Sequence, residues 1–164
     1  MSFIIGDRMS VKKTVDGSET DVENIVMDLL SRASESVDYS SGLHIPFYGR
    51  QKIIEAFKSA VERVNSFRLL LDSDVKIEEI KKEKSLEWVF DLQKQGKIEI
   101  HQSKEKIPHR IIVDDRDFRL ETNHNIKTGG STNFVVKNAD ETVKEITTDI
   151  ICEFDDDWDR SQPV

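Results

Sequence analysis

The sequence predicts an α/β fold with a mixed, largely parallel central sheet flanked by helices. Segments with apolar residues at helical spacing alternate with short apolar runs that are typical of strands. This alternation favours parallel strands joined by crossover helices. A later pair of strand-like runs is joined by a tight polar turn, which adds antiparallel strands. We therefore expect one sheet with strands of both directions.

The regular structure is predicted to begin with a helix and a strand. Residues 14–20 form a polar break, and an apolar helical pattern follows the capping residues between Ser18 and Asp21. Residues 36–49 are predicted to be a strand that runs into a loop. Three residues of this segment oppose a helix: Gly42, Pro46 and Gly49.

Two more helices and two more strands are predicted in the middle of the chain. Residues 53–64 have an amphipathic helical pattern, and residues 67–72, FRLLLD, suit a strand buried on both faces. A further helix begins at Ser85 and ends before Gly96, a residue type favoured just after a helix. Residues 97–101 form a short strand.

The last third of the chain predicts a hairpin, another strand and a long helix. The runs RIIVDD and DFRLET are strands joined by a turn at Asp114–Asp117. A glycine-rich connection leads to the strand NFVVK, residues 133–137, and a helix begins near Ala139. Asp114 and Asp115 could perform acid–base chemistry, but we interpret them as ordinary turn residues.

Length and composition indicate one domain in a reducing compartment. The 164 residues divide into an N-terminal arm, residues 1–19, and a domain, residues 20–164. The lone Cys152 excludes an internal disulfide, and no apolar run approaches the roughly 20 residues of a membrane span. The apolar stretch at the N-terminus is too short for a signal peptide. We therefore expect a cytoplasmic protein.

The net charge of −8 disfavours general nucleic-acid binding, which needs a basic face. The charge is uneven, because residues 76–110 are rich in lysine whereas every charged residue from Asp149 to Asp159 is acidic. A local anion site near residues 104–110 is therefore compatible with the net charge, and nucleic acid would have to bind through such a basic patch. The acidic run lies on a predicted helix, where its carboxylates do not converge on a cation, so we expect it to be a solvated face.

We expect neither a metal nor a cofactor. No two of the 4 histidines share a strand or helix at the spacing of metal ligands. The sequence also contains no glycine-rich dinucleotide fingerprint and no Walker pattern.

Three segments of the sequence match the motifs of one known family. HRIIVDDRDF, residues 109–118, is similar to a strand–turn–strand that carries an H-x-K-x-x-x-x-D motif. GGSTNF, residues 129–134, is similar to the G-S-x-N segment that follows this motif. A Phe-x-x-x-Trp-x-x-Ser-x-Pro pattern near the end of the chain also matches, and four residues carry it: Phe154, Trp158, Ser161 and Pro163. Together these features resemble one half-domain of the phospholipase D-like superfamily, and the resemblance covers roughly residues 20–164.

The resemblance implies a phosphodiesterase chemistry whose residues are incomplete in this chain. In active members the histidine attacks phosphorus, the lysine binds phosphate and the aspartate orients a histidine. This chain keeps His109, but Ile111 stands at the lysine position and Arg116 at the aspartate position. Residues two apart on a strand share a face, so Arg110 points away from His109 unless a bulge intervenes. The motif is therefore degenerate.

His109 is the candidate nucleophile, and a structural role at the entry of a strand is the alternative. Six further residues are candidate ligand or anion contacts: Arg110, Lys106, Ser131, Asn133, Tyr48 and Arg50. The first two could replace the missing lysine. The next two belong to the glycine-rich segment, whose N–H groups could converge on an anion or form an exposed loop. The last two follow the first strand, where loops line the ligand crevice of an open sheet.

Two function classes follow from these observations. The first is a catalytically impaired binding or regulatory module, such as a small-ligand or anion sensor, or an accessory subunit that docks a partner protein. The second is a metal-independent phosphodiesterase or nuclease in which His109 of two copies meets across a homodimer. The resemblance implies a homodimer, because active single-half members pair to bring two motifs together. Related half-domains are sensor parts of archaeal transcription regulators, although this sequence has no helix-turn-helix segment. The sequence favours the first class.

Overall fold

The computed structural model describes residues 8–124 and 131–164, and these residues form one mixed sheet with helices packed on it. The strand order in the sheet is β1-β7-β6-β5-β2-β3-β4-β8. The strands are β1 (Ser10–Gly17), β2 (Ser36–Ser41), β3 (Ser66–Leu71), β4 (Glu99–Gln102), β5 (Arg110–Val113), β6 (Asp117–His124), β7 (Ser131–Lys137) and β8 (Gln162–Pro163). The predicted α/β class is therefore confirmed.

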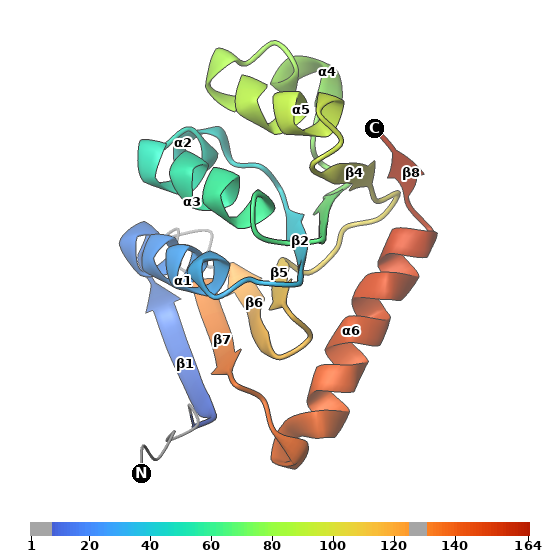
Figure 1. Cartoon of the computed structure of the whole chain (residues 1–164). Coiled ribbons are helices and arrows are strands. Elements are labelled where there is room, and N and C mark those ends of the chain that lie inside the picture. The colour runs from blue at the N-terminus through green and yellow to red at the C-terminus, as the bar shows by residue number, and fades with distance from the viewer. Residues whose placement is uncertain (1–7, 125–130) are drawn as a thin grey trace.

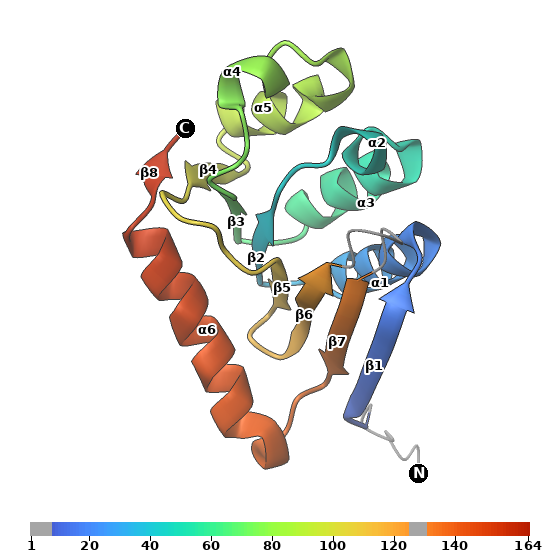
Figure 2. The same cartoon turned by 180° about the vertical axis from the view of Figure 1, so that it is seen from behind.

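Helices lie on both sides of the sheet (Figures 1 and 2). One side carries α1 (Glu19–Ser31), α2 (Ile45–Tyr48), α3 (Gln51–Val61), α4 (Ile77–Ile80) and α5 (Glu87–Lys94), with a short 3-10 helix, η1 (Lys84–Leu86), before α5. The other side carries the long helix α6 (Lys144–Asp159), which follows a second 3-10 helix, η2 (Glu141–Val143). None of the helices in the described ranges is long and apolar enough to span a bilayer.

Each central strand buries side chains on both faces of the sheet. Alternate residues of a strand point to opposite faces, so neighbouring apolar residues enter different cores. Three residues pack under the helices α1 to α5: Leu69, Ile111 and Val135. The residues that follow them in sequence pack under α6: Leu70, Ile112 and Val136. This double burial is the reason for the near-continuous apolar runs in the sequence.

The sheet is mixed as predicted, but the expectation that it is largely parallel is wrong. Among the described strands only β2–β3 and β3–β4 pair in parallel, and helices α3 and α5 lie in their crossovers. No helix lies between β4 and β5 in the described chain, and β5 returns to pair antiparallel with β2. Strands β6, β7 and β1 then extend the sheet by antiparallel pairing. The helix–strand alternation in the first half of the sequence therefore predicts the parallel strands correctly, but it does not predict the antiparallel strands that follow.

Two local predictions are also wrong. Helix α2 lies in the segment predicted as a loop, because Pro46 occupies its first turn, where no intrahelical N–H bond is needed, and Gly49 follows its end. Residues 14–17, predicted as part of a polar break, continue β1 at the edge of the sheet. Edge strands are often polar, which hides them from a search for apolar runs. β1 lies within the predicted arm, and the division of the chain at residue 20 stays a prediction.

The predicted start of α1 is confirmed in detail. The Ser18 hydroxyl accepts the N–H of Asp21 at 3.2 Å, and the Asp21 carboxylate accepts the N–H of Ser18 at 2.8 Å. This reciprocal capping box satisfies N–H groups that the first turn of a helix leaves without partners. It fixes the start of α1 directly after β1 and so shapes one border of the pocket described below.

The C-terminal pattern of Phe, Trp, Ser and Pro attaches α6 and β8 to the sheet. Phe154 and Trp158 lie on the buried face of α6, and the His101 ring of β4 stacks on Trp158 with ring centres 3.9 Å apart. Ser161 Oγ lies 2.7 Å from His101 Nδ1, and Pro163 pairs with His101 in the sheet. The pattern is thus explained by packing.

Candidate phosphodiester-type site and ligand pocket

A pocket of about 440 Å³ lies at the end of the sheet where β2 and β6 end and β5 and β7 begin. These strands meet at one end because neighbours among them run antiparallel. Residues from β1, α1, β2, α2 and β6, from the link between β2 and α2, and from the position just before β5 line the pocket: Gly17, Glu19, Val22, Val26, Tyr39, Ser41, Gly42, His44, Phe47, Tyr48, His109, Arg119 and Glu121.

His109 lies at the entry of β5 with a carboxylate near each ring nitrogen. Its Nε2 is 3.4 Å from Asp72 Oδ2, and its Nδ1 is 3.8 Å from Glu121 Oε1. The ring also lies beside Gly42, where an added Cβ would be 3.6 Å from Cε1. Burial lowers the pKa of His109 below 6.5, and the opposing effect of Glu121 and Asp72 does not cancel it. The imidazole is therefore predominantly uncharged at neutral pH.

Arg119 supplies a cation to the pocket from β6. The ladder pairs Arg119 with Ile111, so the two side chains lie on the same face of the sheet. The Arg119 side chain is 4% exposed, its Nε donates to Asn133 Oδ1 at 2.7 Å, and its Nη2 pairs with Glu121. An arginine from the adjacent strand therefore stands beside the position where the motif would have lysine.

Two tyrosines form a hydrogen-bonded wall of the pocket. The hydroxyls of Tyr39 and Tyr48 are 3.0 Å apart, and Ser41 Oγ donates to Tyr48 Oη at 2.8 Å. Burial raises the pKa of Tyr39 well above its usual range and raises that of Tyr48 as well. Both side chains are therefore neutral hydrogen-bonding groups. The Phe47 ring, 5.0 Å from that of Tyr48 between centres, adds an apolar surface.

The structure brings three of the predicted site residues together. His109 and Tyr48 line the pocket, and Asn133, which is fully buried, holds the Arg119 guanidinium at its border. Arg50 does not line the pocket, but it forms ion pairs with Glu19, which does, and with Glu23.

The other predicted residues do not contribute a described side chain to the pocket. Arg110 points to the α6 face, as strand alternation requires without a bulge, and its Nη2 lies 2.8 Å from Asp157 Oδ2. Lys106 is exposed, with its Nζ 3.4 Å from Asp74 Oδ2. Ser131 begins β7, but its side chain and the two preceding glycines lie outside the described residues.

Sequence reasoning missed Arg119, Glu121 and Asp72. A signal for the first two was present: a tight turn at residues 114–117 sets a hairpin register that places Arg119 opposite Ile111. Glu121 follows on the same face of β6, and its N–H donates to the His109 carbonyl at 3.0 Å. Asp72 gives no local signal, because its contact with His109 depends on how β3 and β5 flank β2.

The charges of the pocket compensate one another. Arg119 pairs with Glu121, Glu19 pairs with Arg50, and burial keeps His109 predominantly neutral. Within the residues that the structure describes, no group of three or more His, Cys, Asp or Glu side chains could hold a metal ion. The arrangement is suited to hydrogen bonding with a small molecule.

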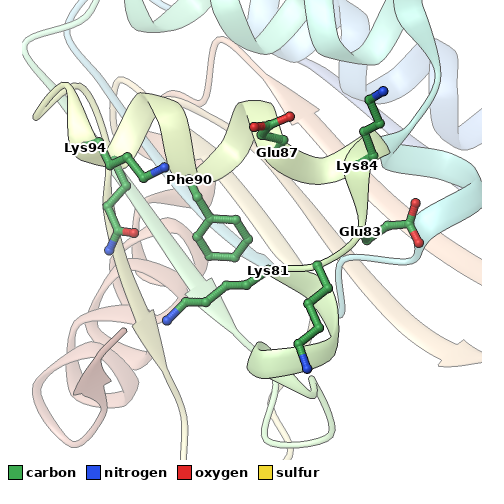
Figure 3. A pocket seen from close by; sticks show the side chains of 8 residues that line it. Lys81, Glu83, Lys84, Glu87, Phe90 and Lys94 are labelled. Carbon is green, nitrogen blue, oxygen red and sulfur yellow. The ribbon is translucent and has the colours of Figure 1, made fainter.

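A second, larger hollow of about 570 Å³ lies beside α5 and is rich in lysine (Figure 3). Lys81 and Lys94 line it together with Phe90. Their amines already lie 3.7 Å and 3.4 Å from the carboxylates of Glu78 and Asp91. Exposed pairs of this kind are weak, so the hollow resembles an ordinary mixed-charge surface.

Solved structures identify the fold. NucT from Helicobacter pylori has a TM-score of 0.68 and 13% identity, with 96% of this chain and 100% of that chain covered. Nuc from Salmonella typhimurium, a phospholipase D family member, has a TM-score of 0.66 and 16% identity, with 96% and 99% covered. This chain has a phospholipase D-like fold. The resemblance to the phospholipase D-like superfamily is thus confirmed at the level of the fold, and the degenerate motif stays a prediction.

The phospholipase D-like fold is shared with a protein of a different kind. TrmBL2, an archaeal chromatin protein with a novel mode of DNA binding, has a TM-score of 0.71 and 15% identity. The match covers 94% of this chain and 53% of TrmBL2, so the phospholipase D-like chain spans about half of that protein. No family model and no curated protein matches the sequence.

Proposed function

We propose that this phospholipase D-like chain is a noncatalytic binding module that holds a small, uncharged polar molecule beside His109. The charge balance of the pocket is the observation that supports this most. Arg119 is already paired with Glu121 and hydrogen-bonded to Asn133. A phosphate would have to displace Glu121 and also approach the carboxylate of Asp72, at a cost in electrostatic repulsion.

The remaining lining suits a neutral ligand with hydrogen-bonding groups. Ser41 and Tyr48 provide hydroxyls, and His109 provides an imidazole. Phe47 offers an apolar surface on the same side as Tyr48. Pockets of about 300–1,000 Å³ with mixed lining hold small molecules, and this one, at about 440 Å³, is at the small end of that range.

Phosphodiester cleavage is the second candidate, because Arg119 and Asn133 gather around His109. A nucleophilic histidine needs a ring nitrogen that is open to phosphorus. Here the two ring nitrogens face carboxylates at 3.4 Å and 3.8 Å. The proposed homodimer, which rests on the resemblance to single-half phospholipase D-like enzymes, would supply a second His109 without removing these carboxylates. This geometry favours binding over cleavage.

A ligand screen tests the proposal. An uncharged polar compound is expected to raise the melting temperature of the wild-type chain and to leave that of Gly42→Leu unchanged, because the leucine side chain would grow from a point 3.6 Å from His109 Cε1 into the pocket. Lys106→Gln, outside the pocket, is the control and should respond like wild type. Hydrolysis of a bis-phenyl phosphodiester or of single-stranded DNA by wild type, with loss in His109→Ala, would contradict the proposal. Sedimentation of the wild-type chain measures the homodimer separately.

A further inference from the structure

We propose that Glu121 determines the charge of the ligand that the pocket accepts, by neutralising Arg119 and facing His109. This inference rests on the proposed function, since it concerns the same pocket. One carboxylate contacts both groups that could otherwise hold phosphate. Its Oε2 pairs with Arg119 Nη2, and its Oε1 lies 3.8 Å from His109 Nδ1. Glu121 therefore makes the pocket selective against anions.

The sheet holds Glu121 in this position. Glu121 pairs with Asn133 of β7, and its N–H donates to the His109 carbonyl at 3.0 Å on the other side. It stands two residues after Arg119 on the same strand, so both side chains project from one face. Because the backbone is already fixed, only side-chain torsions have to be ordered when the carboxylate pairs with the guanidinium, which lowers the entropic cost of the pair.

Burial makes this pair difficult for an external anion to break. The side chains of Arg119 and Glu121 are 4% and 9% exposed. Charges attract each other more strongly in such surroundings than in water. A free phosphate would compete with a partner already in contact, and it would be repelled by that partner if it approached His109.

Removal of the Glu121 charge should convert the pocket into an anion site. Arg119 would keep the side-chain amide oxygen of Asn133, Oδ1, as an acceptor, but its charge would lose the partner that the structure shows. A buried guanidinium without a counter-charge is a strong site for a phosphate oxygen. Aromatic and hydroxyl groups would still line the rest of the pocket, so its shape would be largely preserved.

The test measures binding of inorganic phosphate by calorimetry and by shifts of the His109 ring resonances. Glu121→Gln is expected to bind phosphate at least about tenfold more tightly than wild type. The double variant Arg119→Gln/Glu121→Gln should lose this gain. Glu99→Gln, an exposed Glu-to-Gln change on β4, is the matched control. Lys81→Gln/Lys94→Gln in the Glu121→Gln background should keep the gain, since it weakens only the lysine hollow beside α5, where Lys82 and Lys84 are the other two lysines.

The outcomes separate this inference from the proposed function. Glu121→Thr, which suits a strand, is measured in parallel in case Glu121→Gln folds poorly. Folded variants that bind no more phosphate than wild type would overturn the role of Glu121 and leave the binding module standing. Tight phosphate binding by wild type, lost in Arg119→Gln, would overturn both. A gain that persists without Arg119 but disappears without Lys81 and Lys94 would place the anion at the hollow and overturn the inference.

Discussion

Arg119 lies opposite Ile111 across the β5–β6 ladder, and Glu121 on its own strand holds its guanidinium. The strand that begins after His109 therefore has an apolar side chain where the phospholipase D-like motif has lysine. Arg119 of the neighbouring strand β6 supplies a cation instead, and Glu121 of the same strand neutralises it. Under the proposed function, this pairing of Arg119 with Glu121 is what makes the pocket favour a neutral ligand.

Restoring lysine at position 111 is expected to destabilise the chain and to produce no phosphodiesterase activity. Ile111 is fully buried, and a lysine there would place a second cation opposite Arg119. An unpaired buried charge costs about 3–5 kcal/mol, whereas the control Ile111→Val should cost about 1 kcal/mol. Urea unfolding measures both free energies. A lysine variant as stable as wild type would show that position 111 tolerates a cation and would contradict this account.

The stability of the chain is expected to depend on pH through His109. Burial lowers the pKa of His109 in the folded chain below the 6.5 of an unperturbed histidine, so the folded state binds fewer protons than the unfolded state. The stability that depends on an uncharged His109 is fully present above pH 6.5, and it is lost as the pH falls through the pKa of His109 in the folded chain. His109→Gln should therefore flatten part of the fall in stability between about pH 7 and pH 5, as followed by chemical denaturation. Parallel pH profiles for the two proteins would contradict this.

The neighbour Asp72 should influence the same titration. Its carboxylate lies 3.4 Å from His109 Nε2 and raises the pKa that burial lowers. Asp72→Asn is therefore expected to lower the pKa of His109 further, which NMR titration of the ring protons measures. Asp74→Asn, an exposed change nearby in sequence, should leave the titration unaltered.

Local signals in the sequence predict the parts of the fold that depend on neighbours in the chain. Ser18, one of the predicted capping residues, caps α1 in a capping box with Asp21, and Gly96 has a φ of 71°, which suits a residue just after a helix. The turn at Asp114 and the hairpin that it joins are also as predicted. Each of these features is decided within a few residues, so the sequence pattern is sufficient.

Features that depend on distant strands could not be predicted in the same way. The direction of β5 follows from its pairing with β2, which no local pattern around residue 110 specifies. Asp72 meets His109 only because β3 and β5 both flank β2. The register of the β5–β6 hairpin, in contrast, follows from its tight turn. Counting residue pairs outward from this turn places Arg119 and Glu121 beside His109.

The two aspartates of the β5–β6 turn should respond differently to substitution. Both have positive φ, 53° for Asp114 and 52° for Asp115. The Asp114 carboxylate also accepts the N–H groups of Glu35 at 2.8 Å and Ser36 at 2.9 Å, so Asp114→Ala is expected to cost about 2–4 kcal/mol. Asp115 is exposed, and Asp115→Gly should stabilise by about 0.5–1 kcal/mol through relief of strain. Thermal unfolding compares them, and equal effects would contradict the anchoring role of Asp114.

Arg110 is expected to serve the attachment of α6 and to play no part in ligand binding. Its side chain is 2% exposed, and its Nε and Nη1 have no hydrogen-bond partner among the described residues. Asp157 supports its charge at 2.8 Å, and Glu153 lies farther away at 3.8 Å. Asp157→Ala should therefore cost about 2–4 kcal/mol, somewhat less than a fully buried pair would, because Asp157 is 17% exposed and Glu153 is retained.

The double variant Arg110→Met/Asp157→Ala tests whether Arg110 stabilises the fold, or whether Asp157 only offsets the cost of burying the Arg110 charge. Methionine is apolar like the cluster that contains Ile107 and Phe118 under α6, and it carries no unpaired N–H group, so the double variant should recover most of the lost stability. A double-mutant cycle from urea unfolding measures this recovery. The pocket lies on the opposite face of the sheet, so ligand-induced shifts in melting temperature should be the same as in wild type. Removal of a buried charge that has lost its partner should raise the free energy of unfolding. A double variant that is less stable than Asp157→Ala alone would therefore mean that Arg110 stabilises the fold by more than its ion pair.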